Sequence, residues 1–185
     1  MKNIVITGGA GFIGSHVVRL FVNKYPEYNI INLDKLTYAG NLANLKDIEG
    51  KPNYKFVKMD ICDFEAFYTL MQKEQIDGII HLAAESHVDR SIKDPFTFAR
   101  TNVMGTLNIV QAARDLGVQK VVHTSTSEVY GTAQFVPITE EHPLQGQSPY
   151  SASKIGADQM ALSYHRSFDT PVTVLRPFNT YGPRQ

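Results

Sequence analysis

The feature that most constrains the fold is a glycine-rich segment near the amino terminus, TGGAGFIG at residues 7–14. It follows a short apolar run and precedes a segment with helical apolar spacing, so it predicts a turn between a strand and a helix. Gly9, Gly11 and Gly14 satisfy the spacing G-x-G-x-x-G, and Gly8 extends the set. Glycines at these positions permit a tight turn, close approach of a pyrophosphate, and close packing of helix on strand. The segment therefore predicts an anion site at a helix amino terminus.

Short β-branched runs alternate with longer helical patterns along the chain. The predicted strands are residues 3–7, 29–33, 54–58, 78–83, 120–124 and 171–175. The predicted helices are residues 11–25, 64–74, 96–116 and 148–167. Strands that alternate with helices favour right-handed crossovers and a parallel sheet covered on both faces. We therefore expect an α/β fold with a doubly wound parallel sheet of the Rossmann type, and residues 1–185 as one domain.

Composition narrows the classes of function. Lys plus Arg and Asp plus Glu both number 18, so the basic excess typical of nucleic-acid binding is absent. No apolar run is long enough to span a membrane, and the first residues lack the build of a signal peptide. A single cysteine, Cys62, fits a reducing compartment, and the six histidines show no metal-ligand spacing. We expect a cytoplasmic protein that binds no nucleic acid, no membrane and no metal.

An acidic residue stands at the end of the second predicted strand. Asp34 lies about 20 residues after Gly14, where a carboxylate accepts hydrogen bonds from the ribose hydroxyls of a dinucleotide. A carboxylate there repels a 2′-phosphate, so NAD is favoured over NADP. Asp60 and Ile61 follow the third predicted strand. Asp60 either pairs with the adenine edge while Ile61 packs on the ring, or it caps the next helix.

A tyrosine and a lysine stand four residues apart in the last predicted helix. Tyr150 and Lys154 therefore share one helix face. A tyrosine of ordinary pKa, about 10, is a poor base at neutral pH. We expect the Lys154 ammonium, with a positive nicotinamide ring, to lower the pKa of Tyr150 into the working range. The alternative is that Tyr150 and Lys154 lie on a surface helix and have no catalytic role.

A cluster of hydroxyl and acidic side chains follows the fifth predicted strand. Thr126, Ser127 and Glu128 fall at a carboxyl end of the sheet, where α/β folds place ligands. Thr126 can polarise a sugar hydroxyl or keto group, and Glu128 can transfer a second proton. Ordinary turn chemistry is the competing interpretation of the hydroxyls.

These motifs together resemble the extended short-chain dehydrogenase/reductase superfamily of nucleotide-sugar enzymes over all 185 residues. Within it, DKLTYAGN at residues 34–41 and HLAAESHVDRS at residues 81–91 closely resemble the dTDP-glucose 4,6-dehydratases. The resemblance implies NAD as cofactor and a nucleotide-diphosphate sugar as substrate. The implied cofactor-binding residues are Gly8, Gly11, Phe12, Ile13, Gly14, Asp34, Lys35, Thr37, Asp60, Ile61, Leu82, Ala83, Ala84, Thr101, Tyr150 and Lys154.

The second half departs from that pattern. Ser127 stands where the dTDP-glucose enzymes usually carry Asp, and their usual insertion between residues 116 and 120 is absent. Thr-Ser-Glu is similar to GDP-sugar 4,6-dehydratases and UDP-glucuronate decarboxylases. Residues 121–185 look most like dehydratases of the legionaminic-acid type, which act on an N-acetylglucosamine nucleotide. The change of resemblance near residues 105–113 suggests a chimera, or a diverged hybrid, of two dehydratase branches.

A 4,6-dehydratase mechanism is what the resemblance implies. Tyr150 removes the sugar 4-OH proton as hydride passes to NAD, and Glu128 then removes the C5 proton as the C6 hydroxyl leaves. Hydride returns to C6, so the reaction is redox-neutral. Ser127 replaces the usual acid for water departure, which leaves Glu128 to do both jobs. The residues expected to contact substrate are Ser86, His87, Arg90, Thr126 and Asn179, with a satisfied structural histidine as the alternative for His87.

Three alternatives stay open. A 4-epimerase shares Tyr150 and Lys154 but needs no C5 base, and a UDP-glucuronate decarboxylase shares Thr-Ser-Glu but lacks the stretch at residues 81–91. The third is a non-catalytic NAD-binding module, because the polar loop at residues 176–185 ends the sequence and the carboxy-terminal substrate domain is largely absent. We expect the amino-terminal part of a longer architecture, active poorly or not at all by itself. The resemblance also implies a homodimer through the helices at residues 96–116 and around Tyr150.

Overall fold

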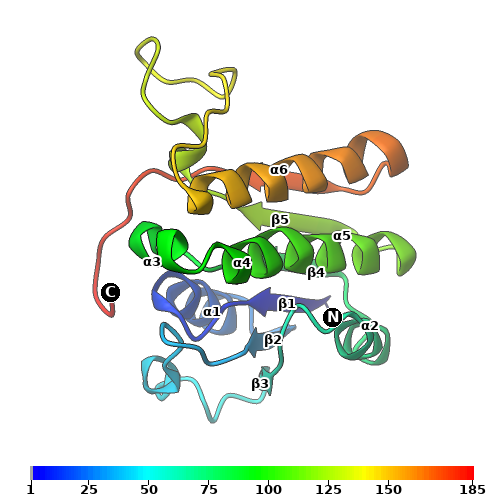
Figure 1. Ribbon diagram of the computed structural model, residues 1–185. Coiled ribbons are helices and arrows are strands. Elements are labelled where there is room, and N and C mark those ends of the chain that lie inside the picture. Colours follow the sequence, from blue (N-terminus) through cyan, green and yellow to red (C-terminus); the bar gives the residue numbers. More distant parts are fainter. Residues whose placement is uncertain (1) are drawn as a thin grey trace.

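Six parallel strands form one sheet in this computed structural model, which describes residues 2–185 (Figure 1). The strand order is β3-β2-β1-β4-β5-β6, and every neighbouring pair is parallel. The strands are β1 Lys2–Thr7, β2 Tyr28–Asp34, β3 Tyr54–Lys58, β4 Gly78–His81, β5 Lys120–Thr124 and β6 Val172–Leu175. The predicted doubly wound parallel sheet is confirmed.

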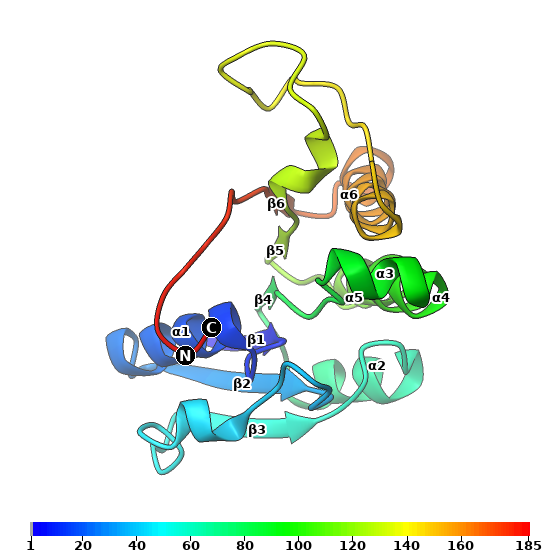
Figure 2. The same ribbon diagram turned by 60° about the vertical axis from the view of Figure 1, so that its left-hand side comes forward.

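Helices cover both faces of this sheet, as Figure 2 shows edge-on. The helices are α1 Phe12–Lys24, η1 Leu42–Leu45, α2 Phe64–Lys73, α3 Val88–Lys93, α4 Pro95–Phe98, η2 Ala99–Met104, α5 Gly105–Asp115, η3 Ser127–Tyr130 and α6 Pro149–Phe168. Successive side chains along a strand point to opposite faces of the sheet, so the core has two parts. Val5, Ile31 and Ile79 pack with α2 and α5, whereas Ile4 and Ile30 pack with α1. No helix among residues 2–185 is long and apolar enough to cross a membrane.

The predicted helix at residues 96–116 is three consecutive helices. Asp94 caps α4 by accepting from the Thr97 backbone N–H, a π-helical segment, η2, follows, and α5 continues from Gly105. The preceding helix α3 was missed, and β4 ends at His81, earlier than the predicted residue 83. Apolar spacing did not reveal the π-helical segment, because such segments are short bulges within an otherwise α-helical pattern.

The strand order changes direction between β1 and β4, because β2 pairs with one side of β1 and β4 with the other. Chains leave these two strands toward opposite faces, and a crevice opens at their carboxyl ends. The glycine segment after β1 and the segment after β4 meet at this crevice. The fold therefore brings together the motifs that the sequence singled out.

Candidate active site

The glycine segment forms the floor of the crevice. Gly8 has a φ of +73°, and a Cβ on it would lie 2.6 Å from the backbone N of Ala83. A Cβ on Gly14 would overlap the carbonyl group of Gly8. Gly11 is the N-cap of α1 and supplies no capping side chain, and the first turn holds no acidic residue. This uncapped helix terminus fits a pyrophosphate, since its N–H groups and dipole attract anions.

A cleft opens above this floor. Most of the predicted cofactor residues line it: Gly8, Gly11, Asp34, Lys35, Thr37, Asp60, Ile61, Leu82, Ala83, Ala84 and Thr101. Phe12, Ile13 and Gly14 lie beside it in the first turn of α1, and Tyr150 and Lys154 lie outside it. Sequence reasoning missed other lining residues, namely Leu33, Ala39, Gly40, Met59, Glu85 and Thr97. Several of these are next to predicted residues in the sequence, and that proximity could have identified them.

Asp34 is fixed at the end of β2 with its carboxylate at the cleft. One oxygen accepts from the backbone N–H of Ala10 at 3.0 Å, and the other accepts from Leu36 at 2.8 Å. The side chain is 9% exposed. Its orientation is therefore set by the turn itself, which supports the predicted contact with a ribose.

Asp60 forms an ion pair with Lys35 at 2.6 Å on the cleft wall. Burial alone would raise the pKa of Asp60, but the Lys35 ammonium and the Cys62 backbone N–H hold it below its usual value. The alternative that Asp60 caps the next helix is wrong, because Asp63 is the N-cap of α2 and accepts from the Ala66 N–H. The ion pair instead joins the segment after β2 to the segment after β3.

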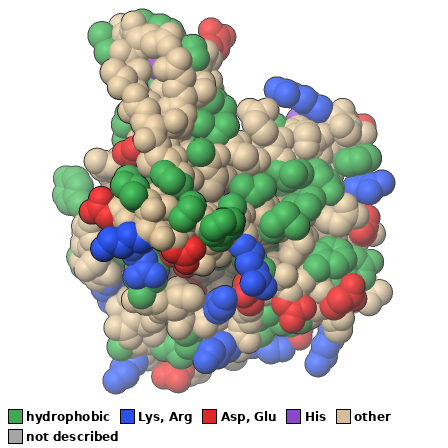
Figure 3. All heavy atoms as spheres, viewed as in Figure 1, with side chains coloured by type: hydrophobic (Ala, Val, Ile, Leu, Met, Phe, Trp, Pro, Cys, Tyr) green, Lys and Arg blue, Asp and Glu red, His purple; other side chains and the backbone are tan. Residues whose placement is uncertain are grey.

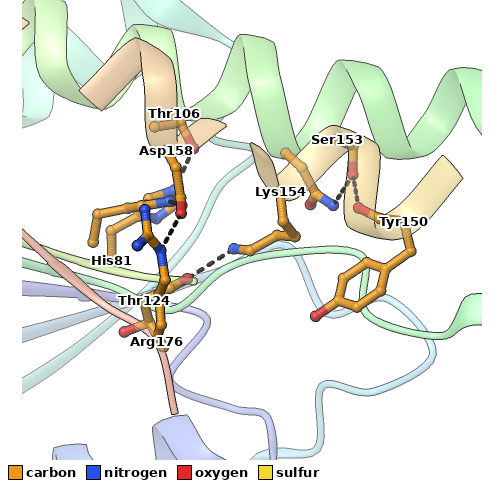
Figure 4. A network of polar contacts seen from close by, with 10 residues as sticks. His81, Thr106, Thr124, Tyr150, Ser153, Lys154, Asp158 and Arg176 are labelled. Carbon is orange, nitrogen blue, oxygen red and sulfur yellow. Dashed lines mark hydrogen bonds and ion pairs between the residues drawn. The ribbon is translucent and has the colours of Figure 1, made fainter. Parts of the chain in front are cut away.

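Tyr150 and Lys154 lie one turn apart in α6, and both are buried. The capping box of Ser148 and Ser151 starts this helix two residues before Tyr150. Figure 4 shows the Lys154 ammonium turned toward Thr124, to whose carbonyl oxygen it donates at 2.7 Å. The Tyr150 ring leaves the helix in a different direction.

In the cofactor-free chain Lys154 is not among the groups that shift the pKa of Tyr150, so the expected lowering by Lys154 together with a nicotinamide ring stays a prediction. Burial raises the pKa of Tyr150, with the Thr126 side chain opposing the shift and the Glu128 charge adding to it. Burial also lowers the pKa of Lys154 to about 8. The physical reason is that the ammonium is turned to Thr124, while the phenol is desolvated against α4, where Phe98 meets its ring edge-on.

Thr126, Ser127 and Glu128 form the start of η3, directly after β5. Thr126 is the N-cap, and its hydroxyl accepts from the Glu128 N–H at 3.2 Å. A second cleft is lined by Ser127, Glu128, Gly131, Ile138, Gln147, Phe178 and Asn179. The fold therefore brings Glu128 together with the distant Asn179, as expected of two groups on one substrate. Thr126 and Glu128 are also near enough to Tyr150 to change its pKa.

Ser86, His87 and Arg90 are exposed around the start of α3 and line neither cleft. The His87 Nδ1 lies 2.9 Å from the hydroxyl of Tyr38, and the Arg90 guanidinium lies 3.8 Å from the centre of the Tyr38 ring. His87 is thus not a core histidine. Sequence reasoning missed Tyr38, although its position next to Thr37 in the DKLTYAGN segment was a signal.

A buried polar network behind α6 was also missed. The histidines His81 and His123 lie on adjacent strands, paired in register, with ring centres 5.4 Å apart. His81 is hydrogen-bonded to Thr7 at 2.7 Å and to Thr106 at 3.2 Å. Asp158 contacts His123 and Arg176. The available signal was the spacing of Lys154 and Asp158, which places both on one helix face.

Comparison with known proteins places the chain. A family model described as GDP-mannose 4,6 dehydratase matches residues 5–185. The chain belongs to this family. The dTDP-D-glucose 4,6-dehydratase of Mus musculus is 44% identical over 100% of this chain and 52% of its own length. The dTDP-glucose 4,6-dehydratase of Streptomyces griseus is 46% identical over 99% of this chain and 56% of its own length.

Solved structures agree with this placement. The dTDP-glucose 4,6-dehydratase of Streptomyces venezuelae, solved with NAD and TYD bound, has a TM-score of 0.94 and 47% identity, covering 100% of this chain and 58% of its own. The UDP-N-acetylglucosamine 4-epimerase of Methanobrevibacter ruminantium has a TM-score of 0.91 and 32% identity, covering 100% of this chain and 57% of its own.

These comparisons confirm the resemblance to nucleotide-sugar dehydratases and the Rossmann-type fold. The chain spans about half the length of the curated relatives it matches. The change of resemblance near residues 105–113 stays a prediction, because one identity over the whole chain does not compare its two halves.

Proposed function

We propose that this family member is the NAD-binding and catalytic half of a nucleotide-sugar 4,6-dehydratase. The observation that carries the proposal is the presence of two clefts at the carboxyl ends of the strands, with Tyr150 close to residues of the second. A cleft with a glycine floor and Asp34 lies beside β1 and β2. A second cleft with Glu128 lies after β5, and both Glu128 and Thr126 act on Tyr150. The relatives named dTDP-glucose 4,6-dehydratase make this reaction the first candidate.

The residues present fit NAD. Gly8 and Gly14 permit close backbone contacts in this turn that a Cβ would prevent, and α1 presents an uncapped amino terminus that suits a pyrophosphate. Asp34 accepts hydrogen bonds and carries a negative charge, which suits free ribose hydroxyls and opposes a 2′-phosphate. NAD held by these residues would supply reversible hydride transfer, so the net reaction would need no other oxidant.

The chain's own residues supply the proton transfers in this proposal. Tyr150 takes the proton of the sugar 4-hydroxyl, and Thr126 holds the same oxygen. Glu128, exposed to the second cleft, removes the C5 proton and delivers a proton to the departing C6 hydroxyl. Ser127 cannot act as the acid there, because a serine hydroxyl is far too weak an acid at neutral pH. Asn179 orients the sugar from the wall of that cleft.

Binding of NAD to this chain is the first test. We expect NAD to raise the thermal unfolding midpoint clearly more than NADP does. Asp34→Asn reduces the difference between the two cofactors, whereas Asp115→Asn, which neutralises an exposed acid on α5, leaves it unchanged. Greater stabilisation by NADP than by NAD would contradict the role given to Asp34.

Product mass is the test of the reaction. A dehydratase removes one water from its nucleotide sugar, a decarboxylase removes carbon dioxide, and a 4-epimerase leaves the mass unchanged. An epimerase is the second candidate, because epimerase structures also match the whole chain. Glu128 weighs against it, since an epimerase needs no C5 base.

We expect residues 1–185 to bind NAD and to turn over sugars poorly; robust turnover by this chain alone would count against that.

A homodimer in the cytoplasm completes the proposal. Ile92, Phe96 and Met104, on α3, α4 and η2, are 65%, 84% and 50% exposed. Figure 3 shows hydrophobic side chains gathered over these helices. Exposed apolar patches on a helical face are typical of association sites. Sedimentation of the wild type as a dimer and of Phe96→Glu as a monomer is expected; equal masses would exclude this surface.

A further inference from the structure

Buried polar side chains from β4, β5, α6 and the segment after β6 gather behind α6 near Lys154, and the reaction proposed above gives them no role. His81 comes from β4, Asp158 from α6, and Arg176 follows β6 (Figure 4). His123 comes from β5. Asp158 is 0% exposed and His123 is 1% exposed. A carboxylate is rarely buried to this degree unless it is paired, so Asp158 calls for a physical account.

Arg176 supplies the pairing. Its Nε donates to Asp158 Oδ2 at 2.8 Å, and the His123 Nε2 lies 3.2 Å from the other oxygen. Burial alone would raise the pKa of Asp158, but the neighbouring His123, Ser125 and Arg176 side chains hold it below its usual value. Asp158 therefore carries a negative charge inside the protein at neutral pH.

Asp158 also stands one helical turn after Lys154, so the two side chains leave α6 on the same side. The groups around Lys154 are Tyr150 and Asp158 on its own helix, His81 and His123 on the sheet, and Arg176 beyond β6. Burial lowers the pKa of both histidines, which are therefore uncharged, and Tyr150 is a neutral phenol. Among residues 2–185, Asp158 is the carboxylate whose charge opposes the effect of burial on Lys154.

Arg176 extends the connection to the second half of the site. Its Nη1 donates to the hydroxyl of Tyr130 at 3.2 Å, and the guanidinium lies 5.4 Å from the centre of that ring. Tyr130 is the last residue of η3, which also holds Glu128. One carboxylate is thus linked to the helix of Lys154 and, through Arg176, to the helix of Glu128.

We propose that Asp158 is a positioning residue for the reaction inferred above: it is the internal counter-ion of Lys154 and, through Arg176, joins α6 to η3. The role of Asp158 in catalysis rests on the proposed function, whereas its charge interaction with Lys154 does not. Asp158 lines neither cleft, so it acts on cofactor and substrate only through Lys154 and Arg176. It keeps the buried amine protonated and holds the two groups of proton-transferring side chains in a fixed relation.

The test is an NMR titration of Lys154 in the chain labelled with ¹³C-lysine, with its signal assigned by Lys154→Met. The midpoint is expected near 8 in the wild type. Asp158→Asn lowers it by about one pH unit or more, because an adjacent opposite charge is lost. Asp169→Asn is the matched control: it removes the same charge at the αL C-cap of the same helix, where Asn is tolerated, about 20 Å along the axis. A midpoint that moves equally in both variants, or in neither, overturns the proposal.

Asp158→Asn alone leaves the half-buried Arg176 guanidinium without its partner, and this variant can fail to fold. A second pair of variants therefore tests the same charge interaction without an unpaired Arg176. Arg176→Gln keeps the carboxylate, and the double variant with Asp158→Asn removes the pair as a whole. The Lys154 midpoint is lower in the double variant than in Arg176→Gln; equal midpoints refute the counter-ion role. Hydrogen exchange of the η3 amides is expected to be faster than in the wild type in both Arg176→Gln and the double variant, because each loses the hydrogen bond from Arg176 to Tyr130. The titration needs no cofactor, so its result is independent of the NAD-binding test.

Discussion

At the scale of single residues, the environment of Tyr150 differs from what its neighbour Lys154 suggested. Spacing alone predicts that the two side chains share a helix face, and they do. It does not predict which acceptor the ammonium finds, and here that acceptor is the carbonyl of Thr124 at the end of β5. The three-dimensional arrangement of strand ends decides this, and no local pattern encodes it.

We predict that Tyr150 ionises above its ordinary value of about 10 in the cofactor-free chain, because burial disfavours the phenolate. An ultraviolet difference titration of the wild type against Tyr150→Phe isolates this group from the other tyrosines. Addition of NAD is expected to lower the midpoint, since the nicotinamide ring is positive. A midpoint below 10 without cofactor would contradict the role given to burial.

Gly8 provides a second prediction at this scale. Its φ of +73° and its approach to Ala83 both oppose a side chain. Gly8→Ala is expected to destabilise the chain by about 2 kcal/mol or more and to abolish NAD binding, measured by urea unfolding and calorimetric titration. Gly117→Ala is the matched control, because Gly117 has a φ of +65° but open space around it. An equal loss in both variants would show that the backbone conformation, and not the close contact, is responsible.

At the scale of elements, α6 carries Tyr150 and Lys154 and begins with a reciprocal capping box. The Ser148 hydroxyl accepts from the Ser151 N–H at 3.1 Å, and the Ser151 hydroxyl accepts from the Ser148 N–H at 2.9 Å. Ser148→Ala is expected to cost about 1 kcal/mol of stability and to loosen the turn around Tyr150. Ser163→Ala, an exposed site in the same helix, is expected to cost clearly less. Chemical unfolding with hydrogen exchange of the first turn of α6 compares them.

Several elements could be predicted from the sequence because their signals are local. The segment 7–14 identified the first turn, and β-branched runs identified all six strands to within a few residues. The π-helical η2 could not be predicted, because it depends on tertiary contacts. There, Asn102 hydrogen-bonds the Glu85 backbone at 2.9 and 3.0 Å and donates to Ser153 at 2.9 Å. These contacts span 17 and 51 residues, beyond the reach of any periodicity.

The site residues divide in the same way. Gly8, Asp34 and Glu128 stand at strand ends, and the rule that ligands meet the carboxyl ends of parallel strands sufficed to group them. Asp158 and Arg176 were missed because each is unremarkable in sequence, and their significance lies in being buried together. Tyr38 was missed because its partners come from α3, which the sequence did not predict as a helix.

At the scale of the whole molecule, buried uncharged histidines make stability depend on pH. Burial holds the pKa of His81 well below 6.5, so below pH 6.5 the unfolded chain binds a proton that the folded chain does not. The unfolding free energy is therefore expected to fall as pH falls through about 6.5, by up to about 1.4 kcal/mol per pH unit for this group. Urea unfolding across this range measures the slope. His81→Gln flattens it, whereas His165→Gln, at an exposed position, does not; equal slopes in all three proteins would contradict the assignment.

The cofactor cleft and the residues proposed to transfer protons come from different parts of the chain, and this separation has a consequence for recombination. Residues that line the cofactor cleft end at Thr101, and the proton-transferring side chains begin at Thr126. Helix α5 lies between them and packs against α6. A gene that exchanged its sequence within α5 would inherit an intact cofactor cleft and acquire a different set of acids and bases. The architecture would permit one cofactor cleft to be combined with different acids and bases, provided that the α6 surface facing α5 and Asn102 is kept.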